Sequence, residues 1–179
     1  MAESKTVMAV ATATTLGTPD TPIEQAKKEI DEELGQEGSI EDLDFAGNYM
    51  GSLGAKYLAT KLGKMTKTIE LDLRVNNIDD EGVIALIKAV PSSVKVLLLR
   101  NNDIGDDGAK AIAEFLKTNK SVEVLDLSDN DIGDDGAKAL ADAIRVNKTL
   151  KDLDLFHNAI AGDGGRAIAE ALENCSLED

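Results

Sequence analysis

The sequence has little of the chemistry on which most active sites depend. Its 179 residues include one histidine, His157, one cysteine, Cys175, and no tryptophan, and aromatic residues make up 3% of the chain. One cysteine cannot form an internal disulfide bond, and these two residues do not suggest a nucleophile paired with a base. We expect His157 to be a solvent-facing residue that follows its strand. We therefore expect no catalytic residues, no cofactor and no metal site.

Basic residues are also scarce, with 19 lysines and arginines against 34 acidic residues and a formal net charge of −15. Such a charge argues against sequence-independent binding to nucleic acid or to an anionic membrane, because both are polyanions. No apolar run approaches the roughly 18 residues that a membrane helix needs. The charge instead favours a protein partner with a basic segment.

A repeated pattern organises the chain. Five asparagines mark equivalent positions and are separated by 28, 26, 28 and 28 residues. A constant period of this length is typical of stacked repeats. The asparagines are Asn48, Asn76, Asn102, Asn130 and Asn158.

The first half of each repeat predicts a short strand. In the fourth copy, Leu125 and Leu127 alternate with polar residues, so both side chains lie on one face of a strand. The amide of the asparagine that follows can both donate to and accept from the backbone, and we interpret the five asparagines as a structural ladder. The other copies carry Leu43/Phe45, Leu71/Leu73, Leu97/Leu99 and Leu153/Leu155.

The second half of each repeat predicts a helix. Ala137, Leu140, Ala141 and Ile144 form one apolar stripe at helical spacing, and the acidic pair 134–135 precedes them, where a helix N-terminus favours negative charge. Neither half can bury its apolar face alone. Stability must therefore come from the stacking of neighbouring repeats.

From Ile40 to about Leu177 the chain resembles the leucine-rich repeat proteins, and in particular the ribonuclease-inhibitor-like subclass with 28-residue repeats. The resemblance rests on five copies of L-x-x-L-x-L-x-x-N-x-I, each followed by G-A-x-x-L-A or a close variant. It implies an α/β fold: a right-handed solenoid of five βα repeats with a parallel sheet on the concave face and helices on the convex face. The repeats would start near residues 40, 68, 94, 122 and 150, within a domain spanning 36–179.

The N-terminal region is predicted to have two parts. Residues 1–20 are expected to be a flexible tail or a short edge strand; they are too rich in threonine and alanine for a secretory signal, although an organelle transit peptide stays open. Residues 21–35 are expected to be a capping helix, because Thr21 to Glu24 form a capping box and Ile23, Ala26, Ile30 and Leu34 form one stripe. A cytoplasmic location fits these features.

The C-terminal end suggests a different possibility. Residues 174–179 align with residues 147–152, so the pattern of a further strand begins there without a polar capping segment. Solenoids need polar end caps for solubility. We expect either a longer array or self-association through this end.

The acidic residues at 129–136 could suggest a calcium-binding loop, but their spacing does not match that of such a loop. Ile132 and Gly133 interrupt the ligand spacing, and Leu140 stands where a calcium loop needs its bidentate glutamate.

Strand residues that point away from the core define the candidate binding surface, the concave face. Adjacent strands lie about 4.8 Å apart, so equivalent residues form rows of close side chains. The residues between the two core positions are Asp44, Asp72, Leu98, Asp126 and Asp154, and those two positions earlier are Asp42, Glu70, Val96, Val124 and Asp152. Two positions later, Arg74 and Arg100 could clamp a carboxylate or phosphate, and Phe156 lies at the same level.

These features predict a non-catalytic protein–protein interaction module whose concave, largely acidic face binds a basic, partly apolar segment. A competing interpretation is that the aspartates merely belong to the repeat's strand sequence in an acidic protein. The resemblance also admits three other functions: a GTPase-activating protein of the Ran-directed type, a tropomodulin-like cytoskeletal or axonemal component, and a fragment of a pathogen sensor.

Overall fold

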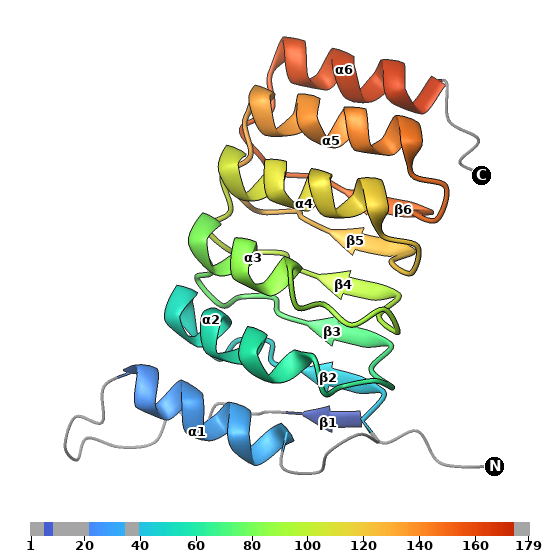
Figure 1. The fold of residues 1–179 in the computed structure, drawn as a ribbon. Helices are drawn as coiled ribbons and strands as arrows, with labels where there is room; N and C mark the ends of the chain where they lie inside the picture. Colours follow the sequence, from blue (N-terminus) through green and yellow to red (C-terminus); the bar gives the residue numbers. More distant parts are fainter. Residues whose placement is uncertain (1–5, 9–21, 35–39, 174–179) are drawn as a thin grey trace.

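The computed structural model describes residues 6–8, 22–34 and 40–173. Strands and helices alternate along this part of the chain (Figure 1). The strands are β1 (Thr6–Met8), β2 (Asp42–Asp44), β3 (Glu70–Asp72), β4 (Val96–Leu98), β5 (Val124–Asp126) and β6 (Asp152–Asp154). The helices are α1 (Pro22–Leu34), α2 (Gly51–Leu62), α3 (Asp80–Ile87), α4 (Asp106–Thr118), α5 (Asp134–Val146) and α6 (Gly162–Glu173).

The described strands form one parallel sheet in chain order, from β1 to β6. The first core leucine of each repeat is in register with that of the next, from Leu43 in β2 to Leu153 in β6. The central leucine of each strand from β2 to β6 therefore belongs to one apolar row under the helices. These features confirm the predicted α/β solenoid.

Helices and strands form two separate layers (Figure 1). A helix with its side chains is about 10 Å wide, whereas neighbouring strands are about 4.8 Å apart. Stacking in register therefore makes the strand layer the shorter, inner side. Between the layers lies a continuous core that includes fully buried Leu58, Leu86 and Ile112 from successive helices.

Part of the N-terminal tail forms a strand. For residues 1–20 the sequence left a flexible tail and a short edge strand as alternatives, and Thr6–Met8 form strand β1, which pairs in parallel with β2 at the edge of the sheet. The exposed edge of β2 offers unpaired backbone N–H and C=O groups, which favours such an added strand. The rest of the predicted tail, and the C-terminal segment 174–179, lie outside the described residues.

Helix α1 covers the first repeat. Its residues Ala26, Ile30 and Leu34 are buried, and the helix packs against α2. On its outer side, the Asp31 carboxylate accepts a hydrogen bond from the hydroxyl of Tyr57 at 2.7 Å and pairs with Lys61 at 2.8 Å. The helix is therefore joined to α2 by both apolar and polar contacts.

The asparagines connect successive repeats. The Asn102 side-chain Oδ1 accepts hydrogen bonds from the backbone N–H groups of Asn76 and Ile78 at 3.1 and 3.0 Å, and its Nδ2 donates to the carbonyls of Leu73 and Leu99 at 3.0 and 2.9 Å. Buried backbone groups of one repeat thus find partners on the next. Corresponding bonds to the preceding repeat are made by Asn76, Asn130 and Asn158.

Aspartates at the helix starts form a second connection between repeats. The carboxylate at the first position of one helix accepts hydrogen bonds from backbone N–H groups at the start of the next helix. Asp80 binds Gly105 and Gly108, Asp106 binds Gly133 and Gly136, and Asp134 binds Ala161. A Cβ atom at Gly108 would lie 2.6 Å from Asp80 Oδ1, which explains the glycine at this point of the repeat.

Asn48 differs from the other four asparagines. Its side-chain nitrogen and oxygen are buried but have no hydrogen-bond partner among the described residues. Among the described residues, Asn102 therefore makes hydrogen bonds between repeats and Asn48 makes none, so the two asparagines can be compared.

We predict that Asn102→Ala lowers the free energy of unfolding by about 3 kcal/mol, because several buried backbone groups lose their partners. Asn48→Ala should cost less than about 1 kcal/mol, because its amide makes no such bonds within the described residues. Urea unfolding of both variants measures the difference. If both variants lost the same free energy of unfolding, the hydrogen bonds of Asn102 would not be the source of its contribution to stability.

Candidate functional site

The strands build the concave face in three rows. The first row holds Asp42, Glu70, Val96, Val124 and Asp152, and the second holds Asp44, Asp72, Leu98, Asp126 and Asp154. Two positions later, the third row holds Ala46, Arg74, Arg100, Ser128 and Phe156. Parallel backbone hydrogen bonds continue past the third row, for example from Asp129 N–H to the Phe156 carbonyl at 2.9 Å. The structure therefore brings the sequence-predicted concave residues together on one surface.

Each aspartate of the second row also stabilises its own strand end. One carboxylate oxygen, Oδ1, accepts a hydrogen bond from the backbone N–H two residues later, which closes a short side-chain turn. The donors are Ala46 at 2.9 Å, Arg74 at 3.0 Å, Ser128 at 2.9 Å and Phe156 at 2.8 Å. The aspartates thus have a structural use, and their negative charge faces the concave surface at the same time.

The two arginines of the third row bind acids of the chain itself. Arg74 Nε donates to both carboxylate oxygens of Asp72 at 2.9 Å, and Asp72 is only 3% exposed. Arg100 Nε donates to Asp129 Oδ2 at 2.8 Å. The sequence predicted that both arginines could clamp a carboxylate or phosphate, and the carboxylates that they contact in the structure belong to the chain itself. The guanidinium of Arg74 compensates the charge of Asp72.

Carboxylates are crowded at the N-terminal end of the concave face. Asp42, Asp44, Glu70 and Asp72 surround a hollow of about 160 Å³ together with Arg74. Burial raises the pKa of Glu70 above its ordinary value, and the negative charges of Asp42 and Asp72 raise it further. Ionisation of Glu70 therefore costs more free energy in the folded protein than in the unfolded chain.

The centre of the face is apolar. Val96, Leu98 and Val124 are neighbours in the first two rows, and all three are half-buried. Acidic residues of the same two rows flank this patch on both sides: Glu70 and Asp152 in the first row, and Asp72 and Asp126 in the second. A partner segment that crosses the strands would thus meet carboxylates, then an apolar patch, then carboxylates.

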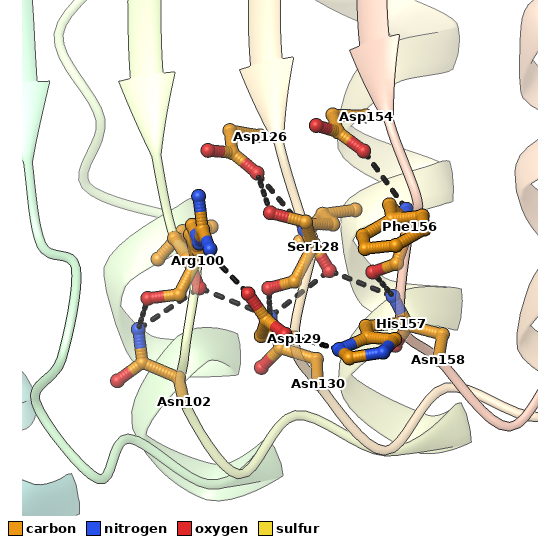
Figure 2. Close-up of polar contacts among 12 residues, drawn as sticks. Arg100, Asn102, Asp126, Ser128, Asp129, Asn130, Asp154, Phe156, His157 and Asn158 are labelled. Atoms are coloured by element: carbon orange, nitrogen blue, oxygen red, sulfur yellow. Dashed lines mark hydrogen bonds and ion pairs between the residues drawn. The ribbon is translucent and has the colours of Figure 1, made fainter.

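The C-terminal end of the face carries a network that the sequence interpretation did not predict (Figure 2). The Asp129 carboxylate contacts Arg100 Nε through Oδ2 and His157 Nδ1 through Oδ1, at 2.8 and 2.9 Å. Its pKa is lowered, first by the hydrogen bond with His157 and also by the charge of Arg100. The ring of His157 stacks on that of Phe156.

His157 was interpreted from the sequence as a solvent-facing residue. Its side chain is 71% exposed, but it also contacts Asp129 and Phe156. The 28-residue step from Asp129 to His157 equals one repeat and so places the two residues at equivalent positions of neighbouring repeats, but it does not indicate how their side chains are oriented.

Within residues 6–8, 22–34 and 40–173, no group of three or more histidine, cysteine, aspartate or glutamate side chains could hold a metal ion. No helix in this part of the chain is long and apolar enough to cross a membrane.

A family model described as Leucine Rich repeat matches residues 68–86, 90–113, 118–141 and 146–169. These segments together make up more than half of the chain, and the chain belongs to the leucine-rich repeat family. The repeat near residue 40, with Phe45 and Met50 in place of the usual leucine and isoleucine, is outside the matched segments. The ribonuclease-inhibitor-like subclass stays a prediction. No curated protein sequence matches the chain.

Several solved structures resemble the fold. One is the actin-binding site 2 of leiomodin-1, with a TM-score of 0.67, 15% identity, and coverage of 87% of this chain and 90% of the other. Another is the tropomodulin C-terminal domain of Caenorhabditis elegans, with a TM-score of 0.63, 16% identity, and coverage of 86% and 93%. An internalin from Listeria monocytogenes has a TM-score of 0.40 at 18% identity, over 70% of this chain and 42% of the other. At these identities the first two show a shared fold.

We predict that Glu70→Gln stabilises the protein at pH 7 by about 0.2–1 kcal/mol, because it removes one of several adjacent like charges. Since the pKa of Glu70 is raised in the folded state, wild type loses stability as pH rises through that pKa. The advantage of the variant should therefore disappear at pH values below about 4.3. Urea unfolding at pH 4 and pH 7 measures this effect.

Glu173→Gln on the exposed surface of α6 serves as the control and should change stability little at either pH. An equal advantage of Glu70→Gln at both pH values would contradict an electrostatic origin.

Proposed function

We propose that this protein is a protein–protein interaction module whose concave face binds a basic, partly apolar segment of a partner. The observation that carries the proposal is the arrangement of carboxylates around the apolar patch of Val96, Leu98 and Val124. Membership in the leucine-rich repeat family supports a binding role, because such solenoids present extended concave surfaces to their partners.

Not every carboxylate contributes equally to this surface. Asp72 is neutralised by Arg74 and is almost completely buried. By contrast, Asp44, Asp126 and Asp154 accept hydrogen bonds from backbone or hydroxyl groups but form no ion pair within the described residues. A cationic partner group would gain most near these three aspartates.

The net charge of the protein and the carboxylates of the concave face both attract a cationic partner. A protein with a charge of −15 attracts cationic partners over several ångströms, and this attraction weakens as salt screens it. The apolar patch would supply contacts that salt does not screen. The proposed complex should therefore form faster at low salt but keep part of its affinity at high salt.

The structure allows the charge of the aspartates to be separated from their structural use. Asparagine retains the Oδ1 acceptor that closes each strand-end turn, but it carries no charge. The triple variant Asp44→Asn/Asp126→Asn/Asp154→Asn thus keeps the turns and removes three charges. Its control is Asp107→Asn/Asp135→Asn/Asp163→Asn, which changes the net charge equally at exposed helix starts.

We predict that a partner captured from a lysate by wild type binds the concave triple variant roughly tenfold more weakly at low salt. The helix-start variant should bind within about twofold of wild type. Calorimetry with the purified partner gives the affinities, and unfolding curves verify that both variants remain folded. If both variants bind like wild type, the concave face is not the binding surface.

Actin is a second candidate partner. The leiomodin-1 domain is an actin-binding site, and this chain shares its fold over most of both chains. At 15% identity the likeness does not transfer individual contacts. The proposal is that this domain shape itself is suited to actin.

We expect the wild-type protein to co-sediment with actin filaments or to bind labelled actin monomers. The helix-start and concave triple variants then identify which face is used. No binding in either assay at protein concentrations of about 50 μM, well above a Kd in the micromolar range, would exclude actin as the partner.

A further inference from the structure

Phe156 and His157 form an exposed aromatic pair at the C-terminal end of the third row (Figure 2). Their ring centroids are 4.6 Å apart and the ring planes differ by 8°. Phe156 is 69% exposed, so the stack leaves much of its ring open to solvent. The solenoid does not require this pair, because the equivalent positions of the other repeats carry no ring: Ala46/Gly47, Arg74/Val75, Arg100/Asn101 and Ser128/Asp129.

The pair is held in place from both sides. His157 Nδ1 contacts Asp129 Oδ1 at 2.9 Å, and Arg100 holds the other oxygen of the same carboxylate. Phe156 N–H donates to Asp154 Oδ1 at 2.8 Å, and the Phe156 carbonyl accepts from Asp129 N–H at 2.9 Å. These contacts already restrict the two residues in the free protein. Binding of a partner would therefore cost less conformational entropy of this surface, which favours affinity.

One carboxylate, that of Asp154, contacts the backbone of Phe156, and a second, that of Asp126, occupies the equivalent position on the neighbouring strand. Neither forms an ion pair within the part of the chain that the structure describes. An exposed ring next to carboxylates attracts a cation through both the ring quadrupole and the negative charges.

Arginine fits this surface better than lysine. Its planar guanidinium can stack on the open part of the Phe156 ring while its N–H groups donate to a carboxylate. A lysine ammonium is a compact, strongly hydrated charge and cannot stack in this way. Aromatic anchors of this kind often dominate the affinity of an interface.

We propose that Phe156, His157, Asp126 and Asp154 form a subsite for an arginine side chain of the partner. The proposal rests on the proposed function, because it assigns one position of the concave face to one residue of the bound segment. It goes further by naming that residue's chemistry and the end of the face where it binds.

Short peptides test the subsite without knowledge of the partner. The probes are acetyl-Leu-Arg-Leu-amide and the same peptide with lysine or with citrulline, an uncharged analogue of arginine. The ring signals of His157 in NMR spectra report binding, since this is the only histidine in the chain. We expect the arginine peptide to bind about two- to fivefold more tightly than the lysine peptide and at least about tenfold more tightly than the citrulline peptide.

Two variants locate the contact. Phe156→Leu keeps an apolar side chain but removes the ring, and it should abolish the preference for arginine over lysine. Tyr49→Asn removes an equally exposed ring from the first repeat, where the next repeat carries Asn77 with a similar backbone φ, and it should leave peptide binding unchanged. Unmoved His157 signals, equal binding of the citrulline peptide, or an unchanged preference in Phe156→Leu would each overturn the subsite.

The captured partner distinguishes the two proposals. If Phe156→Leu binds this partner like wild type while the concave triple variant does not, the concave face is the binding surface and the arginine subsite is wrong. If the triple variant binds it like wild type, the proposed function itself is wrong.

Discussion

Each repeat supplies hydrogen-bond partners that the loop of the preceding repeat lacks, and the other features of the structure depend on this exchange. The loops between strands and helices contain buried backbone groups that neither a helix nor a sheet can satisfy. Asn102 provides both an acceptor and a donor for the loop before it. Asp106 acts in the other direction: its carboxylate accepts hydrogen bonds from the backbone N–H groups of Gly133 and Gly136 at the start of the following helix. A repeat is therefore complete only between two neighbours.

Most side chains of the concave face are not needed for the stability of the fold. Side chains that point toward the helices form the core, whereas those that point away make structural hydrogen bonds only at the strand ends. The second-row aspartates show how one side chain can serve both purposes, since one oxygen closes a turn while the charge faces solvent. The two sequence interpretations of these residues, structural and functional, are thus compatible.

Leucine spacing was enough to predict the strands, the helices and the rows of the concave face, because burial of a repeated apolar pattern has few solutions. Individual contacts between side chains, within a repeat or between adjacent repeats, were not predictable in the same way. Arg74 could have faced a partner, but it folds back onto Asp72, two residues away. His157 was set aside as a solvent-facing residue, yet it contacts Asp129 one repeat earlier. Such choices depend on rotamers and on left-handed loop residues, which periodicity does not report; φ of His157 is 55°.

The concave face has two unlike ends, and this asymmetry bears on how a partner would bind. At the N-terminal end the acids are crowded, Arg74 already compensates Asp72, and the pKa of Glu70 is raised. At the C-terminal end, Asp154 lies beside an exposed ring and lacks an ion-pair partner among the described residues. A cation would relieve repulsion at the first end and gain a specific stacking contact at the second. A segment with arginine at one end only would therefore bind in one direction across the strands.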